Sequence, residues 1–133
     1  MIAFIPAIIF WLIAICYLNG AIIHAANILG FSGYAWLDAP LKWQVLDVFY
    51  LILNLTVVIG LLMGWRAGLI AFFAAATTQL LLYTALRGWI LDVPAHFLKA
   101  GADGSLNGLL VFHAVTVMLV FLALWLKSAP ATA

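Results

Sequence analysis

Four long apolar runs divide this chain, and shorter stretches richer in polar residues, glycine and proline separate them. A run of about 18 or more apolar residues predicts a transmembrane helix, because about 20 helical residues span the ~30 Å hydrocarbon core of a bilayer. We expect spans at residues 2–27, 45–63, 68–90 and 106–126. The alternation typical of membrane β-strands is absent. The pattern therefore predicts an all-α, polytopic membrane protein, with a single four-helix transmembrane bundle over residues 1–133.

Composition excludes most soluble functions. Hydrophobic residues make up 69% of the chain and charged residues 7%, and the mean hydropathy is +1.29. The net charge of +1 gives no reason to expect nucleic-acid binding. Four spans leave no soluble catalytic domain, and no Ser-His-Asp, P-loop or paired-carboxylate signature is present. We do not expect an enzyme that acts alone. The first run has no Lys or Arg before it and exceeds the usual signal core, so we expect a retained helix.

The number of spans predicts the topology. Both termini and the turn at Trp65-Arg66 share one side of the membrane, here called the termini side. Both long connections share the other side, here called the loop side. The positive-inside rule gives no bias, because the two sides carry similar numbers of Lys and Arg.

Small residues predict how two of the helices pack. Gly60, Gly64 and Gly68 recur every four residues across the second turn, and Ala71 and Ala75 repeat at helical spacing on the third helix. Such stripes let helix backbones approach closely in lipid. We expect a close antiparallel hairpin, with all three glycines where the backbones meet.

Polar residues within the spans gather toward the loop side. Asp47, Tyr50 and Asn54 stand at i, i+3 and i+7, and therefore share one helix face. An unpaired polar group inside a membrane costs several kcal/mol, so these positions are informative. The pattern predicts a polar pocket that opens to the loop side and includes an ion pair between Asp47 and Arg87. The alternative is that the same residues only hold the helices in register. The candidate residues are His24, Asn27, Asp47, Tyr50, Asn54, Gln79, Tyr83, Arg87 and His113.

A quinone headgroup suits such a pocket, because His, Tyr and Asn side chains can hydrogen-bond two carbonyls while the apolar tail runs into lipid. His24 and His113 are the best candidate donors. The same two histidines could instead be the axial ligands of haem b, an alternative that we favour less. A copper or zinc site would add His96, but no HxxxH or HxH spacing supports it, so we assign no metal ligands.

Three short motifs resemble a known family. The junction of the second and third helices reads NLTVVIGLLMGWRAG from Asn54 to Gly68, and Gly20 and His24 stand four apart near the end of the first helix. The segment PAHFLK, residues 94–99, precedes a glycine-containing stretch and the last helix. Together these resemble the DoxX-like family of four-helix bacterial membrane proteins. The chain departs from that family at Asn54, where the family has Glu, and at His24, where it often has Lys.

The resemblance implies a multi-pass protein of the bacterial inner membrane with cytoplasmic termini. Members of that family accompany redox enzymes in thiosulfate oxidation to quinone, amine dehydrogenase maturation and oxidative-stress complexes. We therefore expect an accessory subunit of a redox or respiratory assembly, in contact with quinone on its loop, periplasmic side. Expected partners are the lipid bilayer and a larger membrane complex or a second copy of the chain. The alternatives are a structural or assembly subunit without a ligand and, less favoured, a small-molecule or metal transporter.

Overall fold

The computed structural model describes residues 4–128, and every regular element in that range is helical. Four helices are long and apolar enough to cross a membrane: α1 (Ile5–Ile28), α2 (Leu41–Leu62), α3 (Arg66–Tyr83) and α5 (Ala102–Ser128). Three short helices complete the chain: η2 (Trp36–Asp38), α4 (Arg87–Leu91) and η3 (Ala95–Phe97). The all-α fold of a multi-pass membrane protein is confirmed.

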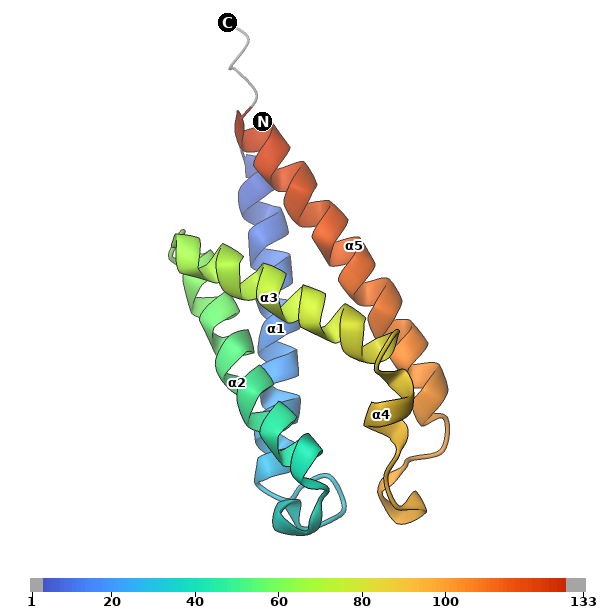
Figure 1. Cartoon of the computed structure of the whole chain (residues 1–133). Coiled ribbons are helices and arrows are strands. Elements are labelled where there is room, and N and C mark those ends of the chain that lie inside the picture. The colour runs from blue at the N-terminus through green and yellow to red at the C-terminus, as the bar shows by residue number, and fades with distance from the viewer. Residues whose placement is uncertain (1–3, 129–133) are drawn as a thin grey trace, which may run out of the picture.

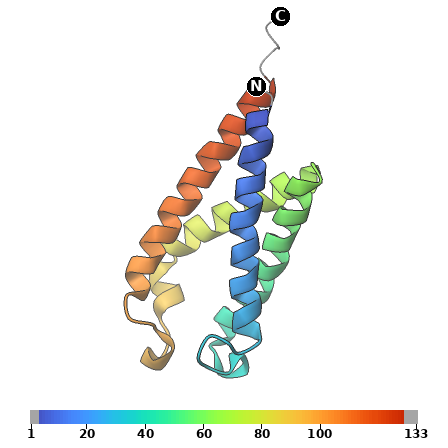
Figure 2. The ribbon, with the colours of Figure 1, turned by 180° about the vertical axis from the view of Figure 1, so that it is seen from behind.

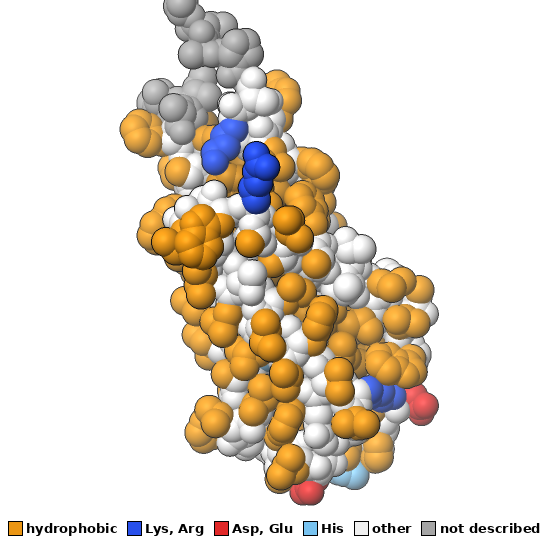
Figure 3. Space-filling model, turned by 60° about the vertical axis from the view of Figure 1, so that its left-hand side comes forward, with side chains coloured by type: hydrophobic (Ala, Val, Ile, Leu, Met, Phe, Trp, Pro, Cys, Tyr) orange, Lys and Arg blue, Asp and Glu red, His pale blue; other side chains and the backbone are white. Residues whose placement is uncertain are grey.

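The helices form an open bundle. α1 and α2 lie side by side with the most extensive contact, and α3 crosses obliquely between α2 and α5 (Figures 1 and 2). α1 and α5 meet near the termini and diverge toward the loops (Figure 2). In Figure 3, hydrophobic side chains cover the middle of the visible face, while charged side chains lie toward its two ends. This surface suits a protein surrounded by lipid.

The hydrophobic core occupies the termini-side half of the bundle. Ile13 of α1, Val57 of α2, Phe72 of α3 and Val120 of α5 are each at most 2% exposed and belong to one cluster. Apolar packing therefore closes this end of the bundle, and the polar residues lie beyond it toward the loops.

Three of the observed boundaries differ from the expected ones by several residues. α2 begins at Leu41 rather than 45, because the Pro40 carbonyl already accepts the first helical hydrogen bonds, from the Trp43 and Gln44 amides. α5 begins at Ala102 rather than 106, directly after a turn at Gly101, whose φ is 77°. α3 ends at Tyr83 rather than 90.

The early end of α3 coincides with a change in backbone conformation at Thr84, which leaves the helical region with φ −112° and ψ −88°. Its hydroxyl donates a hydrogen bond back to the Leu80 carbonyl at 2.6 Å. The chain then restarts as α4 in a new direction (Figure 1).

The α2–α3 hairpin depends on two of the three glycines. A Cβ on Gly60 would collide with the backbone of Gly68, and a Cβ on Gly68 would collide with Gly60. The expectation that Gly64 also lies between the backbones is wrong. No atom lies within 4 Å of a Cβ built there, and its φ of +69° forms the turn instead. Ala71 and Ala75 are buried, as expected.

Replacing Gly60 with alanine should destabilise the protein by roughly 1–3 kcal/mol, because the added methyl pushes two packed backbones apart. Gly108 is the matched control: it also lies within a helix, but a Cβ there meets nothing within 4 Å. Gly108→Ala should leave stability unchanged or raise it by up to about 1 kcal/mol. Thermal unfolding in detergent measures both variants, and equal effects would contradict the role of the Gly60–Gly68 contact.

Candidate functional site

Two adjoining cavities lie where the bundle opens toward the loops. The loop-side cavity has a volume of about 290 Å³ and is lined by His24, Asn27, Tyr34, Trp43, Leu46, Asp47, Tyr50, Leu82, Tyr83, Ile90 and Leu106. The lipid-facing cavity has a volume of about 450 Å³ and is lined by Ile15, Cys16, Tyr17, Asn19, Gly20, Ile23, His24, Asn54, Gln79, Tyr83, Leu109, Phe112 and His113. His24 and Tyr83 line both cavities. Eight of the nine candidate residues line these cavities, and Arg87 does not.

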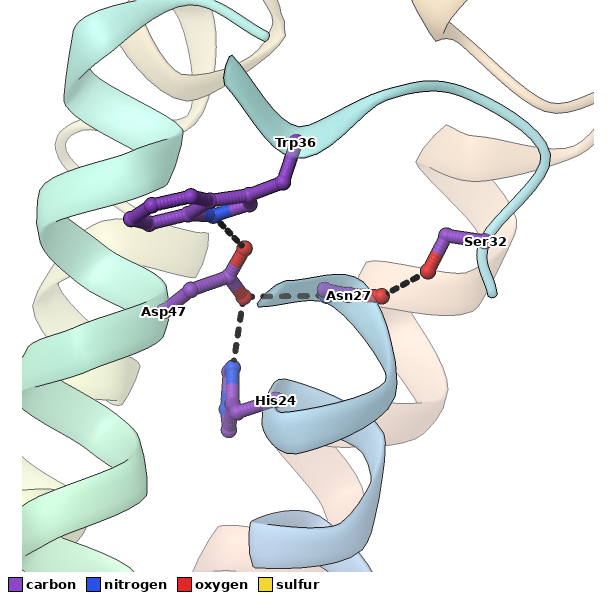
Figure 4. Close-up of polar contacts among 5 residues, drawn as sticks. All are labelled: His24, Asn27, Ser32, Trp36 and Asp47. Carbon is purple, nitrogen blue, oxygen red and sulfur yellow. Dashed lines mark hydrogen bonds and ion pairs between the residues drawn. The ribbon is translucent and has the colours of Figure 1, made fainter. Parts of the chain in front are cut away.

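The carboxylate of Asp47 is the most heavily bonded polar group of the site. Its Oδ1 accepts hydrogen bonds from His24 Nδ1 at 2.8 Å and Asn27 Nδ2 at 2.9 Å, and its Oδ2 accepts one from Trp36 Nε1 at 3.2 Å (Figure 4). Asn27 Oδ1 in turn accepts a hydrogen bond from the Ser32 hydroxyl. This network joins the end of α1, the following connection and the first turns of α2.

The network continues across the bundle through ring stacking. The His24 ring stacks on Tyr50 with centroids 5.7 Å apart, and the Tyr50 hydroxyl donates to Thr78 Oγ1 at 3.0 Å. When His24 is neutral and donates from Nδ1, its Nε2 is an acceptor. His24 thereby connects the Asp47 carboxylate to the wall of the lipid-facing cavity.

The expected ion pair between Asp47 and Arg87 is wrong. Arg87 donates from Nε to Asp103 Oδ1 at 2.7 Å, from Nη1 to Asn107 Oδ1 at 2.8 Å, and from Nη2 to the Asp103 carbonyl. The reason is the break after Tyr83. Arg87 begins α4 rather than continuing the face of α3, and so it reaches the N-terminal end of α5.

The lipid-facing cavity contains buried polar atoms without partners. Within residues 4–128, no hydrogen-bond partner exists for the Tyr17 hydroxyl, Asn54 Oδ1 or either ring nitrogen of His113. Tyr17 and Asn54 are 3% exposed and His113 is 2% exposed. Leaving a buried donor or acceptor unpaired costs about 1–3 kcal/mol each. The fold therefore holds three polar side chains at a cavity wall at the expense of its own stability.

Several site residues were not predicted. Tyr17 precedes His24 by seven residues, so helical periodicity places it on the same face and could have identified it. Tyr34 and Trp36 lie in the connection between α1 and α2, where Trp36 begins the short helix η2 and the periodicity of the membrane helices does not apply. Burial raises the pKa of the Tyr34 hydroxyl above its ordinary value, and the Asp47 carboxylate adds to the effect.

The structure gives no support for the copper or zinc alternative. Within residues 4–128, no three His, Cys, Asp or Glu side chains come together in a way that could hold a metal ion. His96 is exposed in η3 and lines neither cavity. His24 and His113 share the lipid-facing cavity.

Comparison with protein-family models, curated proteins and solved structures finds no match to this chain. The resemblance to the DoxX-like family stays a prediction.

Asp47→Ala should lower the free energy of unfolding by roughly 2–4 kcal/mol, because it strands the donors of His24, Asn27 and Trp36 in partly buried positions. Asp103→Ala is the control: that carboxylate accepts a hydrogen bond from Arg87, but its side chain is 71% exposed. Its loss should cost under about 1 kcal/mol. Denaturant titration in detergent measures both, and an Asp47→Ala protein as stable as Asp103→Ala would contradict the network.

Proposed function

We propose that this protein is an integral-membrane accessory subunit that holds the headgroup of a membrane quinone in its lipid-facing cavity. The observation that carries the proposal is the set of buried, unpaired polar atoms on Tyr17, Asn54 and His113. Natural proteins pair such groups almost without exception, and an unpaired group calls for an explanation. A ligand that supplies the missing partners is the explanation with the clearest chemistry.

The unpaired atoms match both redox states of a quinone. The Tyr17 hydroxyl and one protonated nitrogen of His113 can donate to the carbonyl oxygens of the oxidised form. Asn54 Oδ1 and the other nitrogen of His113 can accept the hydroxyl protons of the reduced form. The same three side chains therefore offer partners to both states.

The position of the cavity favours a ligand dissolved in lipid. Ile15, Cys16 and Ile23 of α1 and Leu109 of α5 line the cavity and are also exposed on the outer surface of the bundle. They lie on the two helices that diverge toward the loops (Figure 2). A headgroup could enter between α1 and α5 while its apolar tail stays in the bilayer.

The remaining parts of the proposal rest on the sequence. Most of residues 4–128 lie in four membrane-length helices, so we expect electrons to pass through a larger membrane assembly or a further copy of the chain. The resemblance to the DoxX-like family favours the bacterial inner membrane, with the termini in the cytoplasm and the cavities toward the periplasmic half.

His113→Leu tests the proposal because leucine keeps much of the volume and removes both ring nitrogens. Quinone extracted from the purified protein and measured by chromatography should fall by at least about tenfold, the effect of losing a hydrogen bond inside a buried site. His96→Leu, at the exposed histidine of η3, is the control and should keep the wild-type content. In quinone-free protein, His113→Leu should raise thermal stability, because an unpaired buried polar group has been removed.

Alkylation of Cys16 provides an independent measure of occupancy, since it is the sole cysteine of the chain and lines the same cavity. Added quinone should slow its alkylation by N-ethylmaleimide in the wild-type protein and not in His113→Leu. A Soret band in the native protein that His113→Leu abolishes would show that the ligand is haem b rather than quinone. A native protein without quinone or haem, and with Cys16 alkylation unaffected by quinone, would favour a structural or assembly subunit.

A further inference from the structure

The loop-side cavity has a buried negative charge that no strong cation neutralises. Asp47 is 6% exposed, and within residues 4–128 the sole basic group within 4 Å of its carboxylate is the His24 ring. Its other two partners, Asn27 and Trp36, are neutral. Neutral donors orient a carboxylate without cancelling its charge, so the cavity carries a net negative charge whenever His24 is neutral.

The two strong cations that begin helices at this end of the bundle are held elsewhere. Lys42 donates to the backbone carbonyls of Trp89 at 2.5 Å and Asp92 at 2.6 Å, and its ammonium lies 5.1 Å from the Trp89 ring centroid. Arg87 is bound to Asp103. Neither side chain lines the cavity.

Four aromatic side chains line the same cavity: Tyr34, Trp43, Tyr50 and Tyr83. Two of them are held by hydrogen bonds, from Trp43 Nε1 to the Ile90 carbonyl at 3.0 Å and from the Tyr50 hydroxyl to Thr78. Tyr34 and Trp43 also pack against Phe97, with ring centroids 5.2 Å and 6.2 Å away. Three of the four rings are thus held in place by contacts within the protein.

A carboxylate among aromatic rings suits one kind of ligand. Aromatic faces attract cations through their quadrupole, most strongly where water is excluded, and alkylated ammonium ions lose little hydration on entering such a site. The cavity volume of about 290 Å³ lies at the low end of small-ligand sites, which span roughly 300–1,000 Å³. It fits a headgroup-sized molecule.

We propose that the loop-side cavity binds an alkylated ammonium group, with Asp47 as its counter-charge and the rings of Tyr34, Trp43, Tyr50 and Tyr83 around it. The ligand is either a free small organic cation or the choline-type headgroup of a lipid, which share this chemistry. The site uses a different cavity from the proposed quinone site and does not depend on that function.

The first test uses the wild-type protein in dodecyl maltoside, which carries no ammonium group. Choline is compared with 3,3-dimethylbutan-1-ol, its neutral isostere, by following the tryptophan indole N–H signals in ¹⁵N-correlated NMR spectra. Choline should shift the Trp36 and Trp43 signals saturably and leave Trp65 and Trp125, on the termini side, unmoved. The neutral isostere should shift none of them. Equal shifts by both compounds, or none by choline, would overturn the proposal.

The second test removes the charge but keeps the shape. Asp47→Asn should weaken choline binding more than about tenfold, since the substitution removes the negative charge that attracts the ammonium group in a partly buried site. Asp92→Asn, an exposed acid at the same end of the bundle, is the control and should bind like wild type. Trp43→Leu should weaken binding as well, and Trp43→Phe should restore part of it through the remaining ring. Unchanged affinity in folded Asp47→Asn would overturn the proposal.

The third test separates the two sources of the ligand. In phosphatidylglycerol nanodiscs without choline, Trp36 and Trp43 should give their unshifted signals. A shift in nanodiscs that contain phosphatidylcholine would assign the site to a lipid headgroup, and a shift produced solely by added choline would assign it to a free cation. Either result supports an ammonium site. If neither condition shifts the signals, the proposal is refuted. Quinone content, measured separately on the same samples, tests the other cavity.

Discussion

The buried carboxylate of Asp47 organises the loop end of this protein. A charge at this depth is tolerated only with hydrogen-bond partners, and it has three, from two turns of α1 and from the connection that follows. These bonds set the register of α1 against α2, the most extensively packed pair of helices. They also hold in place the His24 ring, which lines both cavities, so a wall of each cavity depends on Asp47.

The two halves of the bundle are stabilised by different forces. At the termini end, apolar side chains and the Gly60–Gly68 contact bring the helices together by close packing. At the loop end, hydrogen bonds to Asp47 join α1 to α2, while α1 and α5 diverge (Figure 1). Cavities form where close packing gives way to hydrogen bonding. Within residues 4–128, polar atoms of three buried side chains there have no hydrogen-bond partner, so an energetic cost is concentrated in that half.

Much of the fold and of the site could be predicted because both follow from helical periodicity in an apolar chain. The four apolar runs correspond to the four membrane-length helices, and the spacing of Asp47, Tyr50 and Asn54 places all three on cavity walls. What the pattern could not supply is the position of breaks. Arg87 pairs with Asp103 because α3 ends at Tyr83. Extending the helical periodicity of α3 past that residue predicts the wrong partner for Arg87. Similarly, a stripe of glycines does not reveal that Gly64 forms the turn while Gly60 and Gly68 form the contact.

The walls of the lipid-facing cavity come largely from α1 and α5, the first and the last membrane helices of the chain. Tyr17 and His113 are separated by nearly the whole membrane-embedded sequence, yet their ring centroids are 6.3 Å apart. During biosynthesis the α2–α3 hairpin can form from neighbouring segments while α5 is still unmade. The lipid-facing cavity cannot form from neighbouring segments in this way. It acquires its second wall only when the final helix enters the bilayer, so a chain interrupted before α5 would insert three helices and still lack the site.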